Sequence, residues 1–184
     1  MTAAGPDRAR QLAATDVKRL NRSWRRLPQG RIAVLLDSVS QPYNVGSIIR
    51  TAAALGVDQA WLCGDTAPPG HPAARRTALG TGRYLTLRHE PADPAQAAAA
   101  AAAAGLRVVA VELAAGAVPL HEAPLDGDVC LAFGHEDRGC SAGLLAVAAV
   151  VAYIPQPGRV GSLNVAAAAA IAIAEARRRS WQPG

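Results

Sequence analysis

Apolar and polar blocks alternate along most of this chain in a pattern that predicts strands and helices in turn. Ile32-Ala-Val-Leu-Leu36 is a continuous apolar run, which is typical of a strand buried on both faces. Because predicted strands alternate with predicted helices after residue 30, the predicted fold class is α/β, with a mostly parallel sheet flanked by helices. The expected strands are 32–36, 57–63, 84–87, 108–113, 129–133 and 150–154, and the expected helices are 45–55, 73–79, 94–104 and 163–179.

The first 30 residues follow a different pattern. They predict a basic helix that ends at Leu27-Pro28, with a weak apolar stripe through Leu12, Val17, Leu20 and Trp24. We therefore expect an N-terminal arm over residues 1–30 and one domain over residues 31–184.

Composition supports a single folded domain. Of the 184 residues, 51% are hydrophobic and 18% are charged, a balance that disordered chains do not show. Aromatic residues make up only 4%, which argues against extended base-stacking platforms. No apolar stretch is long enough for a membrane span, and no secretory signal is expected. The odd cysteine count (Cys63, Cys130, Cys140) favours a reduced, cytoplasmic location and no metal site.

Positive charge gathers near the N-terminus. Residues 1–31 hold eight basic and two acidic residues, although the whole chain carries only +5. The remainder is therefore nearly neutral in sum, and an anionic partner is expected at the arm. The candidates for contact with phosphate groups are Arg19, Arg22, Arg25 and Arg26.

Several common active-site motifs are missing. Gly80-Thr81-Gly82 precedes a strand instead of opening a helix, so it does not fit a dinucleotide-binding turn. The sequence contains no P-loop, no HExxH zinc motif and no GxSxG elbow.

Three segments at predicted strand ends combine glycines with polar residues. The first, 37–51, leads into a helix that Asn44 or Ser47 could cap, and Gly46 would permit close backbone approach. Arg50 follows among apolar neighbours. If its guanidinium is buried there, it needs a partner; otherwise the side chain extends to the surface.

The second segment is Gly134-His-Glu136-Asp-Arg-Gly139-Cys-Ser141, and the third runs from Tyr153 to Val165. The second is compatible with a ligand loop or with a plain turn and a solvated Glu136. In the third, Ser162 and Asn164 are both good helix caps, and four prolines and glycines indicate a constrained loop.

Together these segments resemble the three motifs of the SpoU/TrmH family of RNA 2′-O-methyltransferases, in the SPOUT class. Asn44-Val-Gly46-Ser-Ile-Ile-Arg50 resembles the first motif, the segment from Gly134 to Ser141 the second, and Ile154-Pro155 through Ser162-Leu-Asn-Val165 the third. The resemblance covers residues 31 to 179. Two features are atypical: His135 in the second motif, and the run of eight alanines from Ala97.

The resemblance implies a C-terminal deep trefoil knot that holds S-adenosylmethionine. Glu112, Gly134, Ile154 and Leu163 would form the cofactor pocket. It also implies a homodimer with its active site at the subunit interface, in which the helix from Val165 to Ala174 takes part.

The implied reaction is methylation of a ribose 2′-hydroxyl. An arginine is a poor base at neutral pH, so Arg50 would stabilise the charge that develops on the hydroxyl oxygen, or would act as a base only when bound RNA phosphate changes its surroundings. Asn44, Glu136, Ser162 and Asn164 would orient Arg50 and the ribose. The expected partner is RNA, tRNA before ribosomal RNA, and no DNA is expected. The alternatives are a ribosomal RNA enzyme, which could serve antibiotic self-protection, a binding module without turnover, and a nucleotide-dependent oxidoreductase.

Overall fold

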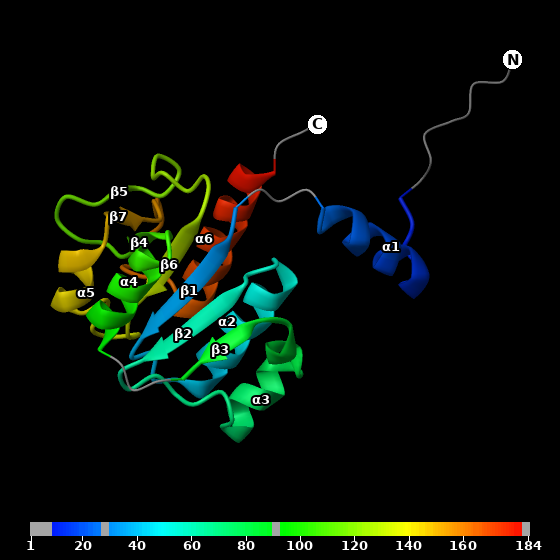
Figure 1. Ribbon diagram of the computed structural model, residues 1–184, viewed down its shortest axis with the longest axis horizontal. Coiled ribbons are helices and arrows are strands. Elements are labelled where there is room, and N and C mark those ends of the chain that lie inside the picture. Colours follow the sequence, from blue (N-terminus) through cyan, green and yellow to red (C-terminus); the bar gives the residue numbers. More distant parts are fainter. Residues whose placement is uncertain (1–8, 27–29, 90–92, 182–184) are drawn as a thin grey trace, which may run out of the picture.

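A seven-stranded sheet forms the centre of the molecule (Figure 1). The computed structural model describes residues 9–26, 30–89 and 93–181. The strand order is β3-β2-β1-β6-β4-β7-β5, and every pairing between these strands is parallel. This confirms the predicted α/β class. The strands are β1 (Ile32–Asp37), β2 (Gln59–Cys63), β3 (Thr86–Arg88), β4 (Arg107–Val111), β5 (Val118–Pro119), β6 (Val129–Phe133) and β7 (Val150–Tyr153).

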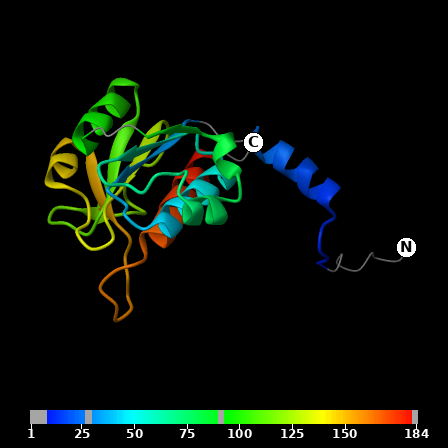
Figure 2. The same ribbon diagram turned by 90° about the horizontal axis from the view of Figure 1, so that it is seen from below.

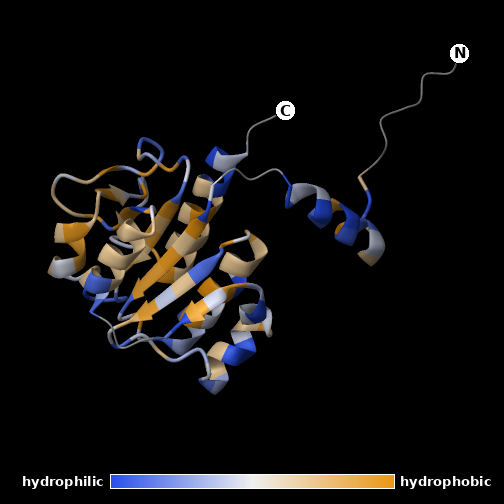
Figure 3. Ribbon diagram, in the orientation of Figure 1, coloured by the Kyte–Doolittle hydropathy of each residue, from blue (hydrophilic) through white to orange (hydrophobic). Residues whose placement is uncertain are grey.

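Helices cover both faces of the sheet, which explains why β1 and β6 are buried throughout (Figures 2 and 3). On one face α2 (Pro42–Ala54), α3 (Pro72–Ala78) and α6 (Val165–Ser180) share a core with the strands. On the other face α4 (Pro94–Ala103) and α5 (Ala142–Val147) complete a second core. A short 3₁₀ helix, η1 (Thr81–Tyr84), precedes β3.

Helix α2 corrects one part of the sequence interpretation. It begins at Pro42 and not near Val45. Proline is tolerated at the start of a helix, because the N–H group that it lacks would have no partner within the first turn. The predicted caps Asn44 and Ser47 are wrong, since the N-cap residue is Gln41 and no side chain caps there.

The alanine-rich α4 forms as predicted, and Asp93 caps it by accepting a hydrogen bond from the Ala95 N–H. Neither β5 nor α5 was predicted.

Two close contacts fix α2 in the fold. Gly46 is needed where α2 meets α3, since a Cβ at this position would overlap Thr77 Oγ1 and the Ala74 carbonyl. At the opposite end of α2, Arg177 of α6 is 3% exposed and donates to the Leu55 and Gly56 carbonyls at 2.9 and 2.6 Å. Arg177 thereby satisfies carbonyls that the end of a helix leaves without partners.

The N-terminal helix α1 (Ala14–Trp24) lies apart from the sheet, and none of its residues is buried (Figure 1). It confirms helix within the predicted arm, although residues 1–8 and 27–29 of that arm lie outside the described residues. In the described part of the chain, no helix is long and apolar enough to cross a membrane.

Arg177→Ala is expected to lower the free energy of unfolding by about 3 kcal/mol, because it leaves two helix-terminal carbonyls unpaired at a buried site. Urea unfolding measures the loss. Arg178→Ala is the matched control: among the described residues its exposed side chain pairs only with Glu175 of the same helix, so its removal should change stability little. Equal losses for the two variants would contradict this role for Arg177.

Candidate active site

Three loops at the carboxyl ends of β4, β6 and β7 enclose a pocket of about 490 Å³. These strands are neighbours in the sheet, and ligands of parallel α/β proteins bind at this end of the strands. The third loop, between β7 and α6, projects away from the sheet (Figure 2). Most of the predicted site residues meet in the lining: Glu112, Gly134, Glu136, Ile154, Ser162, Leu163 and Asn164.

Glu136 is tied to the loop after β1. Its Oε1 accepts from Asn44 Nδ2 at 2.8 Å and from the Gln41 N–H at 3.0 Å. Its Oε2 accepts from both the N–H and the hydroxyl of Ser40. Burial raises the pKa of the Glu136 carboxyl, but these hydrogen bonds outweigh burial and hold the pKa below its ordinary value. Glu136 is therefore a bound carboxylate and not the solvated turn residue of the simpler interpretation.

Asn164 extends this network to the third motif. Its Nδ2 donates to Asn44 Oδ1 at 3.0 Å, while its Oδ1 accepts from the Ala166 and Ala167 N–H groups and caps α6. The cap predicted at Asn164 is thus confirmed. Ser162 lines the pocket but does not cap α6. Asn44 itself is not part of the lining, but it joins Asn164 to Glu136 and so connects all three motifs.

The loop after β6 is shaped by two glycines and by Glu112. Gly139 has φ +68°, and a Cβ there would strike the Glu112 carboxylate. Glu112 Oε2 accepts from the Cys140 N–H at 2.8 Å. His135 pairs with Gly139 through two backbone hydrogen bonds, and its Nδ1 accepts from the Asp137 N–H. The atypical His135 therefore stabilises the turn, and its side chain does so by a local hydrogen bond.

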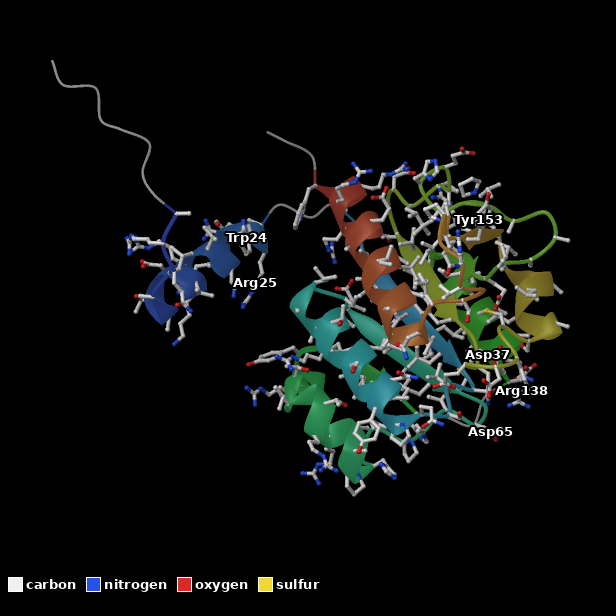
Figure 4. The ribbon with its side chains drawn as sticks, turned by 180° about the vertical axis from the view of Figure 1, so that it is seen from behind. Trp24, Arg25, Asp37, Asp65, Arg138 and Tyr153 are labelled. Atoms are coloured by element: carbon white, nitrogen blue, oxygen red, sulfur yellow. The ribbon has the colours of Figure 1, made fainter. Side chains whose placement is uncertain are left out.

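Asp37 is a site residue that the sequence interpretation missed. It is 3% exposed at the end of β1, and its Oδ2 accepts from the Ser141 N–H at 2.8 Å. Figure 4 shows Asp37 at the end of the sheet near the loop that carries Arg138. The only signal was an acidic residue directly after an apolar strand.

Arg50 lies outside the pocket lining. It is exposed on α2, and within the described residues it has no hydrogen-bond or ion-pair partner. It therefore extends to the surface, one of the two possibilities that the sequence left open.

The four predicted RNA-binding arginines lie on or next to α1, far from this lining. Arg19, Arg22, Arg25 and Arg26 are all exposed and have no carboxylate partner among the described residues. Figure 4 shows Arg25 and Trp24 on α1, away from the sheet.

The pocket suits a cationic ligand with hydrogen-bond donors. Its lining holds three carboxylates (Glu112, Glu136 and Asp137) and one arginine, Arg138. Gln156 also lines it, and Gln156 Oε1 is buried without a hydrogen-bond partner. This acceptor is therefore available to a donor from water or from a bound molecule. Within the described residues, no group of three or more side chains could hold a metal ion.

Comparison with known proteins adds to this geometry. The model of the SpoU rRNA methylase family matches residues 31–174. The chain belongs to this family. It is 34% identical over 156 residues to a tRNA (guanosine(18)-2′-O)-methyltransferase from Thermus thermophilus, with 85% of this SpoU chain and 79% of the relative covered.

Two solved structures share the fold. One is an S-adenosylmethionine-bound rRNA methyltransferase from Sinorhizobium meliloti, with a TM-score of 0.77, 35% identity, and 84% of this chain and 58% of the other covered. The other concerns 2′-OH methylation of C/U34 on tRNA, with a TM-score of 0.70, 34% identity, and coverage of 82% and 96%. This SpoU chain also spans only 59% of a matched tRNA/rRNA methyltransferase from Synechocystis.

Glu136→Gln is expected to lower the free energy of unfolding by about 1–3 kcal/mol at neutral pH, because a charged acceptor of several hydrogen bonds is lost. The lowered pKa means that the stabilisation is complete above the ordinary value of 4.5 and is lost as pH falls through the folded-state pKa. Urea unfolding of both proteins from pH 3 to pH 7 measures this. A stability difference that did not shrink in acid would contradict the bound carboxylate.

Proposed function

We propose that this chain is an S-adenosylmethionine-dependent RNA methyltransferase that methylates a ribose 2′-hydroxyl of tRNA, with ribosomal RNA as the alternative substrate. The observation that carries the proposal is the hydrogen-bonded series Asn164–Asn44–Glu136 at the pocket. It joins the three motifs by which the sequence resembles ribose methyltransferases. Solved relatives of this family support the cofactor.

Glu112, Gly134, Ile154 and Leu163 would hold the cofactor. S-adenosylmethionine supplies an electrophilic methyl group on a sulfonium, and its net positive charge fits the carboxylate-rich lining. Gln156 Oε1 would accept from one of its amino groups. We also propose that the segment after β7 passes through the loop before it, as in the deep trefoil knot that the family resemblance implies.

Arg50 would act on the acceptor hydroxyl. A guanidinium stays protonated near neutral pH, so it can stabilise developing negative charge on the ribose oxygen. Asn44, Glu136, Ser162 and Asn164 would orient Arg50 and the ribose. Asn44 is held on both sides by hydrogen bonds, which limits its side-chain motion.

A homodimer would bring Arg50 into a complete site. Arg50 is exposed and absent from the pocket of its own chain, so the pocket lacks the Arg50 guanidinium unless a second copy supplies it. Helix α6 presents an exposed stripe of Ala167, Ile171 and Ala174, and these mostly small residues permit close helix packing. We therefore place the active site between two copies of the chain.

The arm supports an RNA substrate. The exposed arginines of residues 1–30 would contact phosphates with an affinity that falls as salt rises. Two relatives, of which the chain covers 79% and 96%, carry names that specify tRNA, which favours tRNA over ribosomal RNA. Ribosomal RNA is the second candidate, supported by the Sinorhizobium structure. A cytoplasmic location follows from this substrate.

Arg50→Ala is expected to reduce methyl transfer by at least about 100-fold, because one charge-stabilising group is removed from the transition state. Binding of S-adenosylmethionine should stay within about twofold, since Arg50 is not in the lining. The assay transfers labelled methyl to unmodified tRNA and, separately, to ribosomal RNA. Nucleoside digestion then locates the label on ribose or base.

Label on ribosomal RNA alone would keep the chemistry and overturn the tRNA preference. Absence of label from both RNAs, with measurable cofactor binding, would favour a binding module. Loss of cofactor binding in the folded Arg50→Ala protein would assign Arg50 to the pocket instead.

Mixed dimers test which pocket Arg50 serves. One chain carries Arg50→Ala and the other Asn164→Ala, with different purification tags, and each homodimer should be inactive. If Arg50 acts in the partner's pocket, one of the two sites in the mixed dimer is intact and about half of the activity returns. A mixed dimer without activity would show that Arg50 acts within its own chain.

A further inference from the structure

Charge on the domain is segregated, although its sum is nearly zero. Residues 66–89 contain four arginines and no acidic residue. Residues 90–128 contain six acidic residues and one arginine. The chain after residue 31 is therefore nearly neutral in sum because it contains one basic and one acidic region whose charges largely cancel.

The four arginines lie on neighbouring elements of one edge of the fold. Arg75 and Arg76 lie on α3, Arg83 lies in η1, and Arg88 ends β3. All four are exposed, and within the described residues none has a carboxylate partner. Unpaired like charges repel one another and slightly destabilise the fold, so an anionic partner would be bound favourably here.

An exposed aromatic ring accompanies these charges. Tyr84 is 64% exposed, and the Arg83 guanidinium lies over its ring at 4.8 Å from the centroid. Arg83 Nη2 also donates to Tyr84 Oη at 2.8 Å, which fixes the pair in one geometry. A guanidinium and a ring arranged in this way suit both a phosphate and an unpaired base.

This region is continuous with the active site through α2. Thr77 of α3 has its Oγ1 3.4 Å from the Tyr43 carbonyl, and Gly46 allows the two helices to pack closely. Tyr43 is 55% exposed and directly precedes Asn44, which contacts Glu136 and Asn164. Figure 1 shows α2 and α3 side by side.

We propose that Arg75, Arg76, Arg83, Arg88 and Tyr84 form a second RNA-docking surface, the α3 surface. It binds the phosphate backbone of the substrate beyond the target nucleotide, and Tyr84 stacks on an unpaired base. The proposal rests on the proposed function and deepens it. Because the α3 surface and α1 lie on separate elements, an RNA that uses both must extend beyond its target nucleotide.

The first test neutralises Arg75 and Arg76 together. Arg75→Gln/Arg76→Gln is expected to raise KM for tRNA about tenfold near 0.1 M salt, and to reduce the slope of log affinity against log salt by about 2. The kcat, the affinity for S-adenosylmethionine and the melting temperature should stay unchanged, because neither arginine touches the pocket. Arg75→Lys/Arg76→Lys is the matched control, which keeps the charge and should keep most of the salt slope.

The second test addresses stacking. Tyr84→Ala should weaken RNA binding by about fivefold or more, whereas Tyr84→Phe, which keeps the ring, should bind nearly as the wild type does. Fluorescence anisotropy with labelled tRNA measures binding without turnover.

The outcomes separate the two proposals. If wild-type protein neither binds nor methylates RNA, the proposed function fails and the α3 surface fails with it. If wild-type protein methylates RNA but the glutamine pair leaves KM and the salt slope unchanged, only the α3 surface is overturned. The proposal would also be overturned if the protein self-associates in the absence of RNA and if both added salt and the glutamine pair abolish this association. In that case the arginines would bind the acidic region of a second copy.

Discussion

The carboxylate of Glu136 holds the active-site end of the fold together. It accepts four hydrogen bonds from Ser40, Gln41 and Asn44, which precede or begin α2. A negative charge at the amino end of a helix is also stabilised by the helix dipole. Glu136 thus does for α2 what a side-chain cap does elsewhere, and Asn44 is left available to bind Asn164. The position of one carboxyl group therefore fixes how three distant segments meet.

Glycine makes this arrangement sterically possible. The loop after β6 returns so closely on itself that a Cβ at Gly134 would overlap the backbone at Gly139 and Cys140. Gly139 in turn leaves room for Glu112, which accepts from the Cys140 N–H and so connects β4 to this loop. The path of the loop after β6 therefore depends on these two glycines as well as on the Glu112 carboxylate.

The sequence predicted the elements better than their contacts. Apolar runs located every strand except β5, which has only two residues, and alanine content located α4. The second and third motifs identified the pocket, because each follows a strand and the carboxyl ends of parallel strands lie at one edge of the sheet. The partners of Asp37 and Arg177 could not be predicted, since they lie 104 and about 120 residues away. The start of α2 was missed for the same reason, as its stabilising carboxylate comes from another loop. The sum of the charges likewise gave no sign of the α3 surface, since opposite regions cancel.

The separation of charge gives the molecule two kinds of surface. The pocket lining carries more carboxylates than cations, whereas α1 and the α3 surface carry exposed arginines without carboxylate partners among the described residues. A cationic cofactor and an anionic polymer would therefore be attracted to different places, and each would be disfavoured at the other's site. Arg50 lies on α2, the helix whose first turn contacts the pocket network and whose side packs on α3. In the proposed homodimer, Arg50 of one copy meets the cofactor pocket of the other, and a cation outside the lining can serve the reacting ribose without repelling the cofactor from its pocket.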